Sequence, residues 1–261
     1  MTQINLTVPT AWEQLSQEQL RYLLTTIAKV GDTNHNTPFA SLEDYSSQTS
    51  AQVATYCLFK WNNLKFVCPY ANGWLLSHDD GEFCIDADAI ASAISALDWI
   101  NSLPNQPVRL EYVDGAKALD ADLDVGFSFD DWLSCENLWQ HYQISRSEQP
   151  LIKMAEILYR KPGIKLFPAE ILGIFYWWAA VKQQASILYP NFFRSADTTT
   201  PETTPTPDDI RKGMNAQIRA LTKGDITKEE QILAMDASRA LTELDALAFE
   251  YEELNRKYPS K

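Results

Sequence analysis

The chain has 261 residues, of which 45% are hydrophobic and 22% are charged, and this composition excludes disorder over the whole chain. The formal net charge is −13, and residues 1–150 hold 20 acidic against 7 basic side chains, so the excess negative charge lies in the first part of the chain. Because phosphate binding requires a basic surface, we expect no direct binding of nucleic acid.

The start of the chain contains neither a basic region nor a continuous apolar run, so we predict no signal peptide and a cytoplasmic location. The most apolar stretch, residues 171–181, has 11 residues, whereas a membrane span needs about 20. We therefore expect a buried helix there and no membrane association. The cysteines lack the C-x-x-C spacing of structural zinc sites and are expected to be free, buried thiols: Cys57, Cys68, Cys84 and Cys135.

The first predicted helix begins at Ser16, because Ser16 and Gln19 have the spacing of a capping box. Residues 31–32, Gly-Asp, are expected to end it. A polar loop over residues 33–45 and a second helix over residues 47–61 should follow. The apolar face of the first helix is predicted from its spacing as Leu20, Leu23, Leu24 and Ile27.

A small antiparallel β meander is predicted between residues 64 and 86. Runs of strand-forming residues alternate there with the dipeptides Asn72-Gly73 and Asp80-Gly81, which tolerate the positive φ of tight hairpins. Apolar spacing then predicts a helix over residues 87–100, and alternation predicts a fourth strand over residues 108–113. The three strands of the meander are expected at residues 64–69, 74–77 and 82–86.

The next part of the chain is predicted to be helical. The last of its helices contains the run Phe175-Tyr176-Trp177-Trp178, which is apolar around most of the helix and therefore predicts burial on several sides. The helices are expected at residues 130–142, 148–159 and 169–188.

Residues 195–207 read SADTTTPETTPTP, with six threonines and three prolines. This composition buries little apolar area and favours extended conformers, so we predict a flexible linker. The predicted fold class is mainly α with a small antiparallel β meander, and a C-terminal helical hairpin follows the linker. The predicted regions are an acidic α+β region at 1–145, a helical region packed on it at 146–194, the linker at 195–207 and the hairpin at 208–261.

Two helices are predicted beyond the linker, one at residues 208–221 and one that begins at a capping box of Thr227 and Glu230 and ends near residue 258. Two interpretations of the second helix stay open. It packs as an antiparallel hairpin on helix 208–221, or its distal part docks another helix, because it is more than twice as long as that neighbour. Its apolar residues have heptad spacing and are called the seam: Leu233, Ala237, Ala240, Leu244, Leu247, Tyr251, Leu254 and Tyr258.

The chain contains none of the common cofactor-binding or nucleophile motifs. Asp120, Asp122 and Asp124 occupy alternate positions and Asp131 follows at the twelfth, which is the ligand spacing of a calcium-binding EF-hand loop. Val125 stands where that loop requires glycine, so we expect a solvated acidic loop and predict no metal, cofactor or catalytic residue. The histidines are far apart in sequence and are expected to be structural: His35, His78 and His141.

Residues 214–258, with residues 151–163 and 175–184, carry a family resemblance. These segments read MNAQIRALTKGDITKEEQILAMDASRALTELDALAFEYEELNRKY, LIKMAEILYRKPG and FYWWAAVKQQ. They resemble proteins encoded in the tail modules of bacteriophages and prophages, and those are similar to tail assembly chaperones, which escort the tape measure protein.

The resemblance implies a non-enzymatic protein in the cytoplasm of a bacterial host that binds an apolar helical partner during tail assembly. Self-association stays open. One alternative is a structural virion or neck component that remains in the particle, and another is a metal-dependent enzyme that uses the Asp120 to Asp124 cluster and His141. The candidate partner-binding residues are Leu233, Leu244, Leu247, Tyr251, Leu254, Phe175 and Trp178.

Overall fold

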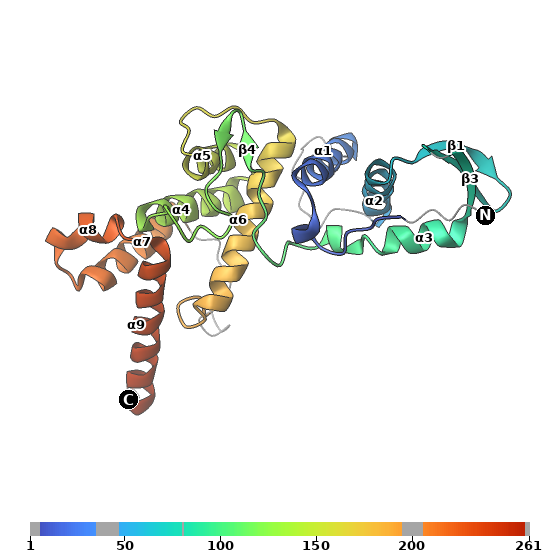
Figure 1. Ribbon diagram of the computed structural model, residues 1–261. Helices are drawn as coiled ribbons and strands as arrows, with labels where there is room; N and C mark the ends of the chain where they lie inside the picture. The colour runs from blue at the N-terminus through green and yellow to red at the C-terminus, as the bar shows by residue number, and fades with distance from the viewer. Residues whose placement is uncertain (1–5, 35–46, 80, 195–205, 259–261) are drawn as a thin grey trace. The chain divides into compact units, whose positions relative to one another are not determined.

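The computed structural model describes residues 6–34, 47–79, 81–194 and 206–258, drawn as ribbons in Figure 1. The chain divides into two units, the first formed by residues 1–111 and 166–176 and the second by residues 112–165 and 177–261. The fold is mainly helical with a small antiparallel three-stranded sheet, which confirms the predicted fold class. The division differs from the predicted boundary after residue 145, because it falls after residue 111 and inside helix α6 (Pro168–Leu188).

In the first unit, helix α1 (Gln17–Asn34) begins at the predicted capping box. The Ser16 N–H donates to Gln19 Oε1 at 2.9 Å, and the Gln19 N–H donates to Ser16 Oγ at 3.2 Å. The predicted end at residues 31–32 is wrong, because α1 continues to Asn34; a glycine inside a helix costs only about 1 kcal/mol. The predicted apolar face, Leu20, Leu23, Leu24 and Ile27, is buried.

Helix α2 (Ser47–Trp61) and the β meander also have the predicted order. The loop predicted between α1 and α2 lies, from residue 35 on, outside the described residues. Gly73 is required where β2 meets β3, because a Cβ atom there would lie 2.0 Å from the Ile85 carbonyl oxygen. The meander consists of β1 (Lys65–Tyr70), β2 (Gly73–His78) and β3 (Gly81–Asp86), paired antiparallel in the order β1-β2-β3.

Two elements that follow the meander are shorter than predicted. Helix α3 (Ala87–Ser95) is shorter than predicted, and a separate 3₁₀ turn, η3 (Asp98–Asn101), follows it. The fourth strand predicted over residues 108–113 is confined to Tyr112–Val113, which form β4. The Gln17 side chain donates to the Arg109 carbonyl at 3.0 Å and accepts from the Glu111 N–H at 2.8 Å, so a helix side chain takes the bonds that a neighbouring strand would make.

The second unit is built on helices. A two-stranded sheet, β4 (Tyr112–Val113) with β5 (Ala116–Lys117), precedes α4 (Phe129–Ser145) and α5 (Gln149–Leu158). The C-terminal part of α6 contributes Trp178, whose ring lies 5.3 Å from Trp132 and 6.3 Å from Phe127. These aromatic contacts form part of the core of this unit.

The predicted linker is wrong at its last two residues. Helix α7 (Pro207–Thr222) begins at a capping box of Thr206 and Asp209, and the rest of the predicted linker, residues 195–205, lies outside the described residues. In the part of the chain that the structure describes, no helix is both long and apolar enough to cross a membrane.

The single helix predicted from Thr227 to residue 258 is also wrong, because the chain forms η4 (Ile226–Lys228), α8 (Glu229–Leu233) and α9 (Ala237–Lys257). Between α8 and α9 the Met235 carbonyl accepts from the Phe129 N–H at 2.7 Å, and the Ala237 N–H donates to the Phe127 carbonyl at 3.0 Å. The start of α4 therefore interrupts the helix. Both α7 and α9 contact α4 as well as each other, so they do not form an isolated hairpin.

Candidate functional site

Helix α9 has a buried half and an exposed half. Its first turns place Ala237, Ala240 and Leu244 in the core, where Leu244 is 4% exposed. Its last turns extend beyond α4, α7 and α8 (Figure 1), and Tyr251 and Leu254 are 66% and 57% exposed there. Residues three and four apart share one helix face. The distal stripe is therefore defined as Leu247, Tyr251 and Leu254 on this face of α9, together with Tyr258, the residue that follows its last turn.

One side of α9 is held by the segment that follows α6. The Asp245 carboxylate accepts from the N–H groups of Asn191 and Phe192 at 2.7 and 2.9 Å, and Arg194 forms an ion pair with Glu252. Burial alone would raise the pKa of Asp245, but these hydrogen bonds outweigh it and hold that pKa below its ordinary value. These contacts attach α9 to residues 191–194, which follow α6, and within the described part of the chain Tyr251, Leu254 and Tyr258 stay exposed.

The other side of the distal stripe is acidic. Glu243 and Glu250 are exposed, and neither has a hydrogen bond or ion pair among the described residues. By contrast, Glu253 forms an ion pair with Arg256 at 2.6 Å. The arrangement can accept an apolar helix against the stripe and cationic groups beside it.

Only some of the predicted partner-binding residues lie on the exposed face of α9. Leu247 is half-buried, and Tyr251 and Leu254 are exposed on one face of α9. Leu233 lies in α8, so it does not continue this face, and Leu244 belongs to the core. Tyr258 belongs to the predicted seam, whereas Glu243 and Glu250 were not predicted. The heptad positions of these two glutamates beside the seam are the sequence signal that would have identified them.

The aromatic run in α6 does not present the predicted surface. Trp178 is 0% exposed in the core. Phe175 is half-buried, and its ring centroid lies 5.5 Å from that of Tyr176. A helix that is apolar on all sides packs on all sides, so Trp178 stabilises the fold instead of contacting a partner.

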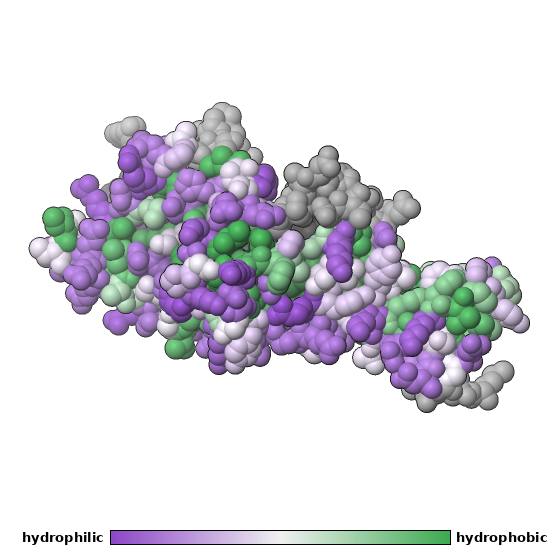
Figure 2. Space-filling view, turned by 90° about the horizontal axis from the view of Figure 1, so that it is seen from above, coloured by the Kyte–Doolittle hydropathy of each residue, from purple (hydrophilic) through white to green (hydrophobic). Residues whose placement is uncertain are grey.

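A second exposed apolar area lies on the β meander. Phe66 and Val67 in β1 are 51% and 44% exposed, and Figure 2 shows hydrophobic surface over the part of the chain that holds this sheet. Phe66 contacts Trp74 edge to face, with ring centroids 5.8 Å apart. Tyr70, the last residue of β1, is 56% exposed and extends this apolar area.

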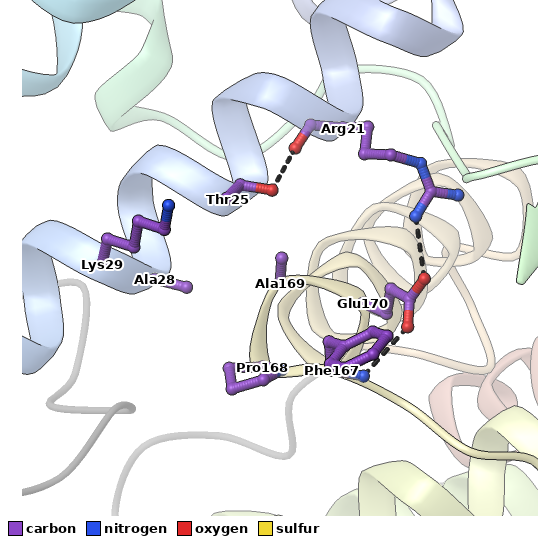
Figure 3. A pocket seen from close by; sticks show the side chains of 8 residues that line it. All are labelled: Arg21, Thr25, Ala28, Lys29, Phe167, Pro168, Ala169 and Glu170. Atoms are coloured by element: carbon purple, nitrogen blue, oxygen red, sulfur yellow. Dashed lines mark hydrogen bonds and ion pairs between the residues drawn. The ribbon is translucent and has the colours of Figure 1, made fainter.

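A pocket of about 390 Å³ lies between α1 and the start of α6 (Figure 3). Its buried charge is already neutralised, because Glu170 pairs with Arg21 at 2.8 Å and accepts from the Phe167 N–H at 2.9 Å. Ala28 and Ala169 belong to its apolar wall, and Lys29 is the remaining cation. Among the described lining residues, the Thr25 hydroxyl donates to the Arg21 carbonyl at 2.7 Å.

The acidic loop before α4 is used structurally. Asp131 caps α4 and forms an ion pair with Arg160 at 2.6 Å. The carboxylate at the twelfth position of the EF-hand spacing is therefore already paired with an arginine. Burial and the Asp122 carboxylate raise the pKa of Asp124. Within the described ranges, no three His, Cys, Asp or Glu side chains are grouped so that they could hold a metal ion.

The remaining predicted residues are dispersed. His78 and His141 belong to different units, and His35 lies outside the described residues. The expectation of buried cysteines is wrong for Cys84, which is exposed, and for Cys68, which is half-buried. Cys57 and Cys135 are buried, and burial raises the pKa of the Cys57 thiol to about 12. In comparisons with known proteins, no family model, curated protein or solved structure matches the chain.

Proposed function

We propose that this protein is a non-enzymatic binding factor that holds an apolar helical segment of a partner protein on the distal stripe of α9. The observation that carries the proposal is the change of burial along one helix face, from Leu244 at 4% exposed to Tyr251 at 66%. The face of α9 that packs in the core at Leu244 is thus exposed at Tyr251. A helix of another protein can pack its apolar face against this exposed part, as paired helices do.

The size of the distal stripe suits a reversible complex. Burying one leucine or aromatic side chain contributes about 1.5–3 kcal/mol, and association entropy opposes the sum. Tyr251, Leu254 and Tyr258 together therefore support weak binding that later steps can reverse. This is the behaviour required of a factor that escorts an aggregation-prone chain.

The family resemblance supports the biological setting. We place the protein among factors of phage or prophage tail assembly in the bacterial cytoplasm, with a tape measure-like protein as the partner. The net charge of −13 favours solubility of such a factor through repulsion between its copies.

The test is co-expression of the full chain with the product of the adjacent open reading frame that encodes a long apolar helical protein, followed by affinity capture. Tyr251→Asp with Leu254→Asp should abolish capture, because pairing would desolvate two unpaired charges. Phe249→Asp is the matched control, since Phe249 is an exposed aromatic of α9 outside the stripe, and it should retain capture. Full capture by the folded double variant would refute the proposal.

A further inference from the structure

We infer that the partner of the distal stripe is a basic amphipathic helix, whose lysine or arginine side chains pair with Glu243 and Glu250. This inference rests on the proposed function and specifies the chemistry of the partner.

The positions of the two carboxylates carry the inference. Glu250 is three residues beyond Leu247 and four before Leu254, so it lies beside the stripe, and Glu243 lies one heptad earlier on the same border. Both are exposed and have no partner among the described residues. The opposite border holds Ala248 and Asn255, which are uncharged.

The other acidic groups of distal α9 are already paired. Glu252 pairs with Arg194, and Glu253 pairs with Arg256 and Lys257. The unpaired negative charge is therefore confined to the border formed by Glu243 and Glu250. In paired helices, the residues beside the apolar seam select the partner by charge.

A second copy of this chain fits the stripe less well than a basic helix. It would bring a net charge of −13 and its own Glu243 and Glu250 to the same surface, where like charges repel. A partner that is apolar and acidic is disfavoured for the same reason. A cationic border on the partner can pair with both carboxylates, and Lys257, one heptad beyond Glu250, already pairs with Glu253.

The experiment compares two labelled synthetic helices of about three heptads that share a leucine seam and differ only in their flanking residues, lysine in one and glutamate in the other. Their binding to the full chain is measured by fluorescence anisotropy at low and high salt. We expect the Kd of the lysine peptide to be at least about tenfold lower at low salt, with the difference shrinking at high salt.

Two matched pairs of substitutions locate the effect. Glu243→Gln with Glu250→Gln should remove most of the preference for the lysine peptide, whereas Glu229→Gln with Glu230→Gln, an equal change of charge on α8, should leave it intact. Tyr251→Ala with Leu254→Ala should weaken both peptides.

The outcomes separate this inference from the proposed function. Equal affinity for the two peptides, or an equal effect of the α8 control, would overturn the basic partner and leave docking on the stripe in place. Binding of the lysine peptide that is unchanged by Tyr251→Ala with Leu254→Ala would place it elsewhere and also overturn the inference. The proposed function is decided separately by capture of the co-expressed partner.

Discussion

Single side chains connect elements that are distant in sequence. Asp131 accepts hydrogen bonds from the Ser128 N–H and hydroxyl at 2.8 and 2.9 Å, and it accepts two from Arg160 at 2.7 and 2.6 Å. Arg160 also donates to the Gly126 carbonyl. One carboxylate thus caps α4 and holds the end of α5 near the acidic loop.

Asp131 gives a prediction with a defined pH dependence. Burial opposes ionisation, but Arg160 and Ser128 outweigh it, so the pKa of Asp131 lies below its ordinary value. Its stabilisation is therefore complete above the unfolded pKa, about 3.9, and is lost as pH falls through the folded pKa. Asp131→Asn should lower the free energy of unfolding at pH 7 by about 1–2 kcal/mol.

Urea unfolding at several pH values checks this result. The difference between wild type and Asp131→Asn should shrink as the pH falls below about 4. Asp130→Asn is the control, because Asp130 is exposed in the same first turn of α4. A difference that stays constant down to acid pH would contradict the assigned role.

At the scale of the element, short sequence motifs predicted the helices and strands whose ends are fixed by hydrogen bonds between nearby residues. The capping box at Ser16 and the turn dipeptides of the meander act within a few residues, and α1 and β1–β3 have the predicted order. The break between α8 and α9 could not be predicted, because its partners, Phe127 and Phe129, are about a hundred residues earlier in the chain. Heptad spacing continues across that break and therefore predicted one helix.

The apolar seam was predicted from the sequence. The position along α9 at which its side chains change from buried to exposed was not predicted. Spacing places Leu244 and Leu254 on similar faces of α9 and does not show which of them other helices cover. The contacts of α9 with α4 and α7 decide this. Of the residues predicted for the surface, Tyr251 and Leu254 are exposed, whereas Leu244 and Trp178 are buried.

The two halves of α9 should respond differently to the same substitution. Leu244→Asp places a charge in the core and should lower the free energy of unfolding by more than about 3 kcal/mol. Leu254→Asp should change it by no more than about 0.5 kcal/mol, because its side chain is 57% exposed. Chemical unfolding followed by far-UV circular dichroism measures both, and equal losses would show that the distal stripe is covered by the protein itself.

At the scale of the whole molecule, the excess negative charge and the distal stripe occupy different parts of the chain. The excess of acidic side chains lies in residues 1–150, whereas residues 151–261 have equal numbers of acidic and basic side chains. The distal stripe belongs to the charge-balanced part. The acidic first part of the chain can therefore repel other copies while the end of α9 stays available for the proposed partner.

The central claim, that the distal stripe holds a partner helix, is tested most directly by site-specific photocrosslinking with the co-expressed candidate partner. A photoreactive phenylalanine analogue is placed at Tyr251 or, as a control on the same helix, at Phe249, since both side chains are exposed aromatics. Crosslinks from position 251 should map to the apolar face of one helix in the partner, and position 249 should give few. Absence of crosslinks from position 251, or equal crosslinking from both positions, would contradict the claim.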